Sequence, residues 1–291
     1  MKAVKALSGQ HSISILCRVL RVNRSSYYKF LNRSSSAREI ENTKIRSYIL
    51  EIYAKTDKRL GVHKTTVCLK QEYCINISDG RVRRLMQTMN LPKMSTVKPP
   101  KFKSVKEDVG TCDNILKQKF DQPAPNKVWV SDFTYIRVSN RFLYICAILD
   151  LYARKVIAYR VSNKIDRFLA IDTLNDAVKN RGTSSGIVFH TDQGSQFTSK
   201  DFRKEIDKFN MIQSFSKKGH PYDNAVMECF FKYLKKEETN RRSFSSQQEL
   251  EISLFKYING FYNSIRPHSH NDDLSPNKKE ALFFNSACPL Y

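Results

Sequence analysis

Three carboxylates, Asp132, Asp192 and Glu228, stand in sequence contexts that could bring them to one metal site. Fifty-nine residues separate the first pair and 35 the second, and Lys235 follows seven residues after Glu228. Carboxylate oxygens are the hard ligands that Mg²⁺ prefers. Two such ions can stabilise both the attacking and the leaving oxygen of a phosphodiester. We therefore expect a metal-dependent enzyme that cuts or joins nucleic acid.

The spacing of these acids is weak evidence on its own. Asp201 and Glu237 are separated by the same 35 residues. Asp201 falls in the first turn of a predicted helix that starts near Ser199, where an acid simply complements the helix dipole. The context of each acid must therefore decide between the two pairs.

Each of the three favoured acids lies in or beside a predicted element. Asp132 is inside the run Val-Trp-Val-Ser-Asp-Phe-Thr-Tyr-Ile, whose β-branched and aromatic residues are typical of a strand. Asp192 follows the apolar run 186–191, at a strand end of the kind where open α/β sheets place ligand groups. Glu228 lies in 223–235, where apolar residues recur at three- and four-residue steps and predict a helix.

Three basic side chains near these acids could contact DNA. At about 100° per residue, Glu228 and Lys235 share a helix face and lie about 10 Å apart along the axis. We predict that Lys235, and Lys232 on the same helix, bind DNA, the alternative being solvated surface lysines. His190 lies two residues before Asp192 and therefore on the same strand face. It could orient water or a DNA phosphate, or be a hydrogen-bonded structural histidine.

The chain is strongly and unevenly basic. It has 291 residues, a net charge of +22 and a pI of about 9.7. Residues 1–125 hold 25 Lys and Arg against 10 Asp and Glu, whereas residues 126–291 hold 25 against 18. The basic excess of the first part should meet a polyanion, and DNA or RNA is the first candidate. The alternative is a soluble protein with solvated lysines.

Composition also argues against several classes of protein. Hydrophobic residues make up 41% of the chain, which is within the globular range. No apolar run reaches 18 residues and no signal-peptide pattern starts the chain, so we expect a soluble, cytoplasmic protein. The seven cysteines form no CxxC, which argues against a disulfide framework or a zinc knuckle. The spacing of His63, Cys68 and Cys74 fits no standard zinc site.

The first 95 residues are predicted to be mainly helical. A short helix-turn-helix-like segment, residues 1–33, precedes a helix-turn-helix domain, residues 37–95. The last helix of that domain starts after a Ser78 cap and carries arginines on its exposed face, as a DNA recognition helix would. The alternative is a small bundle with a solvated basic face. The predicted DNA contacts are Arg81, Arg83 and Arg84, and the predicted helices are 12–20, 25–31, 37–55, 63–73 and 79–90.

Residues 96–125 are predicted to be a basic linker rich in proline and lysine. Five prolines lie between residues 92 and 127, with few apolar runs among them, which is typical of an interdomain segment. Four lysines of this segment could follow a phosphate backbone: Lys98, Lys101, Lys103 and Lys106.

From residue 126 onward the pattern predicts strands alternating with helices. Three strands come first, followed by helix, strand, helix, strand and helix, which is the order of a ribonuclease H-like fold. We therefore predict an α/β fold class, with a mixed five-stranded sheet flanked by helices over residues 126–285, preceded by an all-α helix-turn-helix region. The predicted strands are 128–138, 141–149, 154–161, 186–191 and 211–215, and the predicted helices are 167–180, 199–209, 223–235 and 247–262.

Four motifs in this part, taken in order, resemble those of insertion-sequence transposases. Residues 128–136 resemble their first catalytic strand, and Phe-His-Thr-Asp-Gln-Gly-Ser-Gln-Phe around Asp192 resembles their second motif. Residues 216–237 resemble the third. Residues 37–95 are similar to the helix-turn-helix module of the OrfB proteins of the IS-three family, and 12–31 to the start of those proteins. The C-terminal signature is carried by Tyr262-Asn263, Arg266-Pro267-His268 and Leu274-Ser275-Pro276.

This resemblance implies a DDE transposase with a core like that of retroviral integrases. It implies that Asp132, Asp192 and Glu228 are the metal-binding catalytic triad and that Lys235 is the associated basic residue. With two Mg²⁺ ions per site, or Mn²⁺ in their place, such an enzyme nicks element ends to expose a 3′-OH. It then joins that 3′-OH to target DNA.

The resemblance also bears on the partners. The DNA partners would be the terminal inverted repeats of the element and the target. In this family an upstream frame, OrfA, often supplies end recognition, and frameshifting yields the fused enzyme. Because the chain starts at a methionine and lacks a leucine-zipper heptad, we expect it to be the downstream partner alone. Homo-oligomers on paired DNA ends are also expected.

Two rival functions stay open at this point. A non-catalytic or domesticated DNA-binding regulator would use only the N-terminal helix-turn-helix region. The presence of all three carboxylates and Lys235 disfavours that reading. A plain ribonuclease H-like nuclease would cleave DNA without joining it, so the reaction products distinguish it from a transposase.

Overall fold

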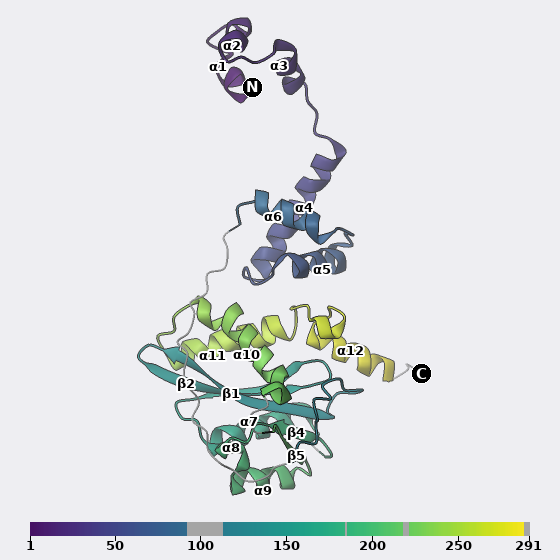
Figure 1. Cartoon of the computed structure of the whole chain (residues 1–291), viewed down its shortest axis with the longest axis vertical. Helices are drawn as coiled ribbons and strands as arrows, with labels where there is room; N and C mark the ends of the chain where they lie inside the picture. Colours follow the sequence, from purple (N-terminus) through teal and green to yellow (C-terminus); the bar gives the residue numbers. More distant parts are fainter. Residues whose placement is uncertain (92–112, 184, 218–220, 288–291) are drawn as a thin grey trace.

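The computed structural model describes residues 1–91, 113–183, 185–217 and 221–287. The chain forms an N-terminal helical module, a second helical domain and a larger domain built on a β-sheet (Figure 1). Most of the predicted linker, including the four lysines named above, lies outside the described residues. Its described end, residues 113–125, contains neither helix nor strand.

The N-terminal module consists of three short helices around a small core. These are α1 (Lys2–Leu7), α2 (Ile13–Val19) and α3 (Arg24–Leu31). The core is formed by Val4, Leu16, Cys17 and Tyr27. Asn23 caps α3, because its Oδ1 accepts a hydrogen bond from the Ser25 amide at 2.9 Å. The helices predicted at 12–20 and 25–31 are confirmed, whereas α1 was not predicted.

The second helical domain matches the predicted pattern closely. It contains α4 (Ala37–Lys55), α5 (Val62–Tyr73) and α6 (Asp79–Thr88). A capping box between Ser36 and Glu39 starts α4, and Ser78 caps α6 as predicted. The buried face of α4 presents isoleucines at three- and four-residue steps to α5 and α6, as an amphipathic helix should: Ile45, Ile49 and Ile52.

The sheet of the large domain is mixed, five-stranded and ordered β3-β2-β1-β4-β5. The first three strands form an antiparallel meander, while β4 pairs parallel with β1 and β5 parallel with β4. This is the predicted ribonuclease H-like, mixed five-stranded arrangement. The strands are β1 (Val128–Val138), β2 (Arg141–Asp150), β3 (Lys155–Ser162), β4 (Val188–Thr191) and β5 (Ile212–Phe215).

Helices cover both faces of this sheet (Figure 1). Strand alternation directs Val130 toward one face and Trp129 toward the other, and each belongs to a separate apolar cluster. The Val130 face packs against α10 (Ala225–Glu237), α11 (Gln247–Phe255) and the π-helix η3 (Lys256–Tyr262). The Trp129 face packs against α7 (Arg167–Arg181), α8 (Ser195–Thr198) and α9 (Lys200–Lys208).

Several short elements complete the large domain. The 3₁₀ turn η1 (Pro221–Asn224) leads into α10, and η2 (Thr239–Arg241) follows it. After η3 come η4 (Ser269–Asn271) and α12 (Pro276–Ala287). The sequence predicted one helix over 247–262, where the structure has α11 followed by a π-helix, and it did not predict α8 or α12. In the part of the chain that is described, no helix is long and apolar enough to span a membrane.

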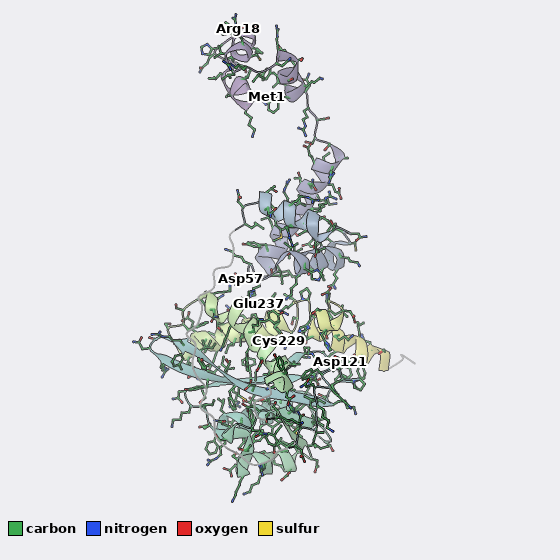
Figure 2. All side chains as sticks on the ribbon, viewed as in Figure 1. Met1, Arg18, Asp57, Asp121, Cys229 and Glu237 are labelled. Atoms are coloured by element: carbon green, nitrogen blue, oxygen red, sulfur yellow. The ribbon has the colours of Figure 1, made fainter. Side chains whose placement is uncertain are left out.

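The helical domain contacts the large domain through the turn between α4 and α5. Arg59 Nη2 lies 2.6 Å from Glu238 Oε2, and Arg241 Nη2 donates to the Asp57 carbonyl at 2.8 Å. Figure 2 shows Asp57 on one side of this contact and Glu237, at the end of α10, on the other. The helix that carries Glu228 is therefore anchored at its C-terminal end to the helical domain.

Candidate active site

Asp132 lies on β1, and Asp192 directly follows β4, the strand that pairs parallel with β1. In the β1–β4 ladder Val128 is opposite Val188 and Val130 is opposite His190, a constant offset of 60 residues. Continued two residues beyond the last strand pair, the same offset would bring Asp132 level with Asp192, which directly follows the end of β4. The topology thus brings two acids that are far apart in sequence to one edge of the sheet.

Glu228 approaches these two acids from the helix layer. It lies in the first turn of α10, which packs across β1. Burial raises the pKa of Asp132 first, and the charges of Asp192 and Glu228 raise it further. Partial desolvation of its carboxylate by the surrounding protein also raises the pKa of Asp192. Asp132 is half-buried whereas Asp192 and Glu228 are exposed, so all three keep access to solvent.

The local backbone holds the two aspartates in place. Asp132 Oδ1 accepts a hydrogen bond from the Phe133 amide at 2.7 Å, and Asp192 Oδ1 accepts one from the Gly194 amide at 3.1 Å. A Cβ at position 194 would lie only 3.0 Å from Asp192 Oδ1. Any larger residue there would therefore push the Asp192 carboxylate aside by a few tenths of an ångström.

Lys235 brings a cation to the same region, two turns along α10 from Glu228. Its Nζ lies 4.8 Å from the centroid of the Tyr135 ring on β1, a cation–π contact. Burial lowers the pKa of Lys235, while the charge of Asp132 opposes this change. Lys232, one turn earlier, is fully on the exposed side of the helix.

The donor set fits a hard divalent cation, although the side chains do not form a preassembled cage. The three carboxylates offer only oxygen, which suits Mg²⁺ or Mn²⁺. Burial and, after it, the charges of Asp192 and Glu228 raise the pKa of Asp132, and a bound cation would favour its ionised form. In the described residues, no three His, Cys, Asp or Glu side chains lie close enough together to hold an ion as they stand.

Comparison with known proteins decides the family. Residues 122–221 and 210–276 match models of the integrase core domain, and residues 39–99 match a model of an HTH-like domain. The chain is 31% identical to transposase InsF for insertion sequence IS3A of Escherichia coli K12, over 93% of this chain and 94% of that protein. The chain belongs to the IS3 family of insertion-sequence transposases.

A second relative of this transposase and two solved structures are also similar. The transposase for insertion sequence element IS904 of Lactococcus lactis is 32% identical, over 84% of this chain and 97% of that protein. A chain of the simian T-cell lymphotropic virus intasome is 14% identical with a TM-score of 0.44, covering 80% of this chain and 74% of its own. The HTLV-2 integrase catalytic core is 15% identical with a TM-score of 0.38, covering 54% of this chain and 98% of its own.

In this transposase His190 is a structural residue, which corrects its predicted role in DNA contact. It is completely buried. Its Nδ1 lies 2.9 Å from Ser214 Oγ, and its Nε2 lies 3.1 Å from both Ser216 Oγ and the Asp223 carbonyl. Burial lowers the pKa of His190 to about 4, so the ring is neutral at pH 7. Both ring nitrogens are occupied inside the protein, and no surface remains for a phosphate.

The three arginines predicted on α6 divide into two groups. Arg81 turns back onto α4, where its guanidinium lies 2.7 Å from a Glu41 carboxylate oxygen and 2.8 Å from Asn42 Oδ1. The Glu41 contact and the Asn42 contact give Arg81 a structural role in this transposase, in place of the exposed position that was predicted. Arg83 and Arg84 are exposed as predicted.

The sequence interpretation missed two polar residues just before α10, the helix that carries Glu228. Asp223 and Asn224 are buried, and both reach other segments of the domain. Asn224 occupies the N-cap position of α10 but makes no capping bond; its Nδ2 instead lies 3.3 Å from the Ser131 carbonyl. An Asp-Asn pair before an apolar helix was a visible signal, but it reads equally well as an ordinary cap.

Proposed function

We propose that this transposase uses Asp132, Asp192 and Glu228 to bind divalent metal ions, that it nicks one DNA strand at each element end and that it joins the freed 3′-OH to target DNA. The observation that carries the proposal is the parallel β1–β4 register, which brings the two aspartates to one sheet edge beneath the helix of Glu228. Membership of the IS3 family supports it.

Each side chain has a role in this proposal. The three carboxylates hold two Mg²⁺ ions, with Mn²⁺ as a substitute; when bound, the ions supply positive charge beside the attacking and leaving oxygens. Lys235 and Lys232, on the face of α10 that follows Glu228, hold the DNA backbone. Arg83 and Arg84 on α6 bind the element end, where an exposed basic helix of a helix-turn-helix domain can enter the major groove.

The proposed partners follow from this reaction. The DNA partners are the terminal inverted repeats and the target site, and the enzyme acts as a homo-oligomer on paired ends. The upstream OrfA protein supplies further end recognition. Such a reaction on chromosomal DNA places the enzyme in the cytoplasm, at the nucleoid.

The test is product mapping on labelled element ends with Mg²⁺, with and without the upstream partner. Asp132→Asn, Asp192→Asn and Glu228→Gln should each abolish nicking and joining while DNA binding survives, because an amide cannot replace a carboxylate toward the metal. The matched control is Asp201→Asn, at the acid with the same 35-residue spacing. Asp201 lies on α9 and pairs with Arg167 at 2.7 Å on the opposite side of the sheet. Full activity in any of these three variants would contradict the assignment of the metal-binding carboxylates. Cleavage without joining would indicate a plain nuclease.

A further inference from the structure

Asp223 lies at the centre of a buried hydrogen-bond network just before the catalytic helix. Its side chain is almost completely buried, with 3% exposed. One carboxylate oxygen accepts from Gln118 Nε2 at 2.7 Å. The other accepts from Asn114 Nδ2 at 2.8 Å and from the Lys217 amide at 2.9 Å. The carboxylate therefore binds the segment 114–118, which precedes β1, to the turn that starts α10.

The same network extends to the strand that carries Asp192. The Asp223 carbonyl lies 3.1 Å from His190 Nε2, and His190 is two residues before Asp192 on β4. His190 Nδ1 contacts Ser214 Oγ, which in turn accepts from the Ile115 amide at 3.0 Å. The backbone and side chain of Asp223 thus close a ring through β4, β5 and the 114–118 segment.

A contact from the neighbouring residue completes the set. Asn224 Nδ2 lies 3.3 Å from the carbonyl of Ser131, the residue directly before Asp132. The network consequently reaches all three chain segments that bear the acids: β1 through Ser131, β4 through His190 and α10 through Asp223 itself. It bonds to backbone and side-chain groups beside the acids, and none of these bonds involves the acids' own carboxylates.

We propose that Asp223 is a positioning residue that fixes the start of the Glu228 helix relative to the strands of Asp132 and Asp192. The need for such a residue follows from the placement of Glu228, which is exposed and has a long, flexible side chain. A site of this kind must be held to about 0.5 Å by supporting contacts. Segment 114–118, far from Asp223 in sequence, supplies two of those contacts and so belongs to the architecture of the site.

In this role the side chain at position 223 must accept hydrogen bonds from Asn114, Gln118 and the Lys217 amide. A negative charge at that position is not required. In Asp223→Asn the amide oxygen can still accept from Asn114 and Lys217, and the exposed Gln118 amide can turn to accept from the new Nδ2. In Asp223→Ala all three donors lose this acceptor, and the turn before α10 is released from segment 114–118. The two substitutions therefore separate positioning from metal binding, because a metal-binding carboxylate tolerates neither.

The experiment measures two quantities on the full chain, and the activity arm rests on the proposed function. The first is the joining rate at saturating Mg²⁺; the second is amide hydrogen exchange of residues 225–230 without metal. Asp223→Ala should lower the joining rate at least about tenfold and speed exchange in that segment, whereas Asp223→Asn should stay within about threefold of the parent. Asp201→Ala is the matched control and should change neither quantity.

Three outcomes would overturn the proposal. If Asp223→Asn is as inactive as Asp223→Ala, the charge is required and Asp223 acts on the metal or the DNA. If Asp223→Ala matches the parent in exchange and joining, the network positions nothing. Should Asp223→Ala fail to fold, Asn114→Ala, in the segment before β1, is expected to give the same pattern more weakly, and parental behaviour there overturns the proposal as well. A parent protein that joins no DNA refutes the proposed function, while the exchange result still decides the positioning role.

Discussion

Glu237 and Arg266 form a buried ion pair with two hydrogen bonds at the C-terminal end of α10. Arg266 Nε and Nη2 lie 2.8 and 2.9 Å from the two Glu237 carboxylate oxygens, and Tyr257 Oη donates to one of them at 2.9 Å. Lys64 Nζ on α5 is 3.8 Å from the same carboxylate. One acid thus joins α10, the C-terminal segment and the helical domain, which explains why an acid at this position need not be catalytic.

Replacing Glu237 should therefore destabilise the fold. Removing one partner of a buried pair leaves the other charge uncompensated and costs about 3–5 kcal/mol. We expect Glu237→Gln to lower the free energy of unfolding by somewhat less, because the amide oxygen still accepts a hydrogen bond from Arg266. Urea unfolding measures the change in the free energy of unfolding. Glu251→Gln, at an exposed residue of α11, is the matched control and should stay within about 0.5 kcal/mol of the parent. Equal stabilities for the two variants would contradict this view of the pair.

The elements that the sequence predicted well are those whose pattern is local. The bounds of α4 follow from its amphipathic spacing, and those of β1 follow from its run of β-branched residues. Tertiary contacts do not change the secondary structure of either element. Helix α1 was missed because its burial rests on Val4 alone, and α12 because Pro276 reads as a helix stop although it begins that helix. The π-helix after α11 depends on packing around Tyr257 and Tyr262, which periodicity cannot reveal.

Only those features of the candidate site that follow from strand alternation or helical periodicity could be predicted from the sequence. Alternation and helical periodicity placed Asp192 at a strand end and Lys235 on the face of Glu228. They could not show that His190 packs against Ser214 and Ser216, because those partners come from a strand distant in the sequence. Arg81 was misplaced for the same reason: its partners lie on α4, about 40 residues earlier.

Stability should depend on pH through Glu280 on α12. Its carboxylate lies 2.7 Å from Lys155 Nζ and 3.1 Å from Arg181 Nη1. Burial alone would raise the pKa of Glu280, but Arg181 and Lys155 outweigh it and lower the pKa below its ordinary 4.5. A depressed pKa in the folded state means that this stabilisation is present above pH 4.5 and is lost as the pH falls through the folded pKa.

The measurement is the free energy of unfolding of the parent and of Glu280→Gln between pH 7 and pH 3. The difference between the two proteins should be constant near neutral pH and shrink below pH 4.5. Asp272→Asn is the matched control, since Asp272 is exposed and pairs with Lys279, the residue before Glu280 on α12. The free energy of unfolding of Asp272→Asn should differ little from that of the parent at every pH between 7 and 3. A gap for Glu280→Gln that widens in acid contradicts the predicted sign.

Binding of DNA should become less salt-dependent when Arg83 and Arg84 are removed. Each phosphate contact contributes about 0.9 to the slope of log K against log salt concentration. The double variant Arg83→Ala/Arg84→Ala should therefore lower the slope by about 1.8 if both arginines contact phosphates. Arg81→Ala on the same helix is the control. Because Arg81 pairs with Glu41, that variant should lose stability and keep the slope. An unchanged slope in the double variant would remove α6 from the DNA interface.

Mg²⁺ should stabilise the folded chain through the three carboxylates. Without a cation, burial and, to a smaller extent, the charges of Asp192 and Glu228 raise the pKa of Asp132. A ligand at 100 times its Kd stabilises the folded state by about 2.7 kcal/mol, which corresponds to a rise of about 5–10 °C in the Tm of a domain of this size.

Asp192→Asn and Glu228→Gln should abolish this Tm shift, whereas Asp201→Asn should keep it. Mn²⁺ should reproduce the effect, and chelation should reverse it. Because this shift needs no DNA, it tests metal binding separately from catalysis; an equal shift in Asp192→Asn would place the ion elsewhere.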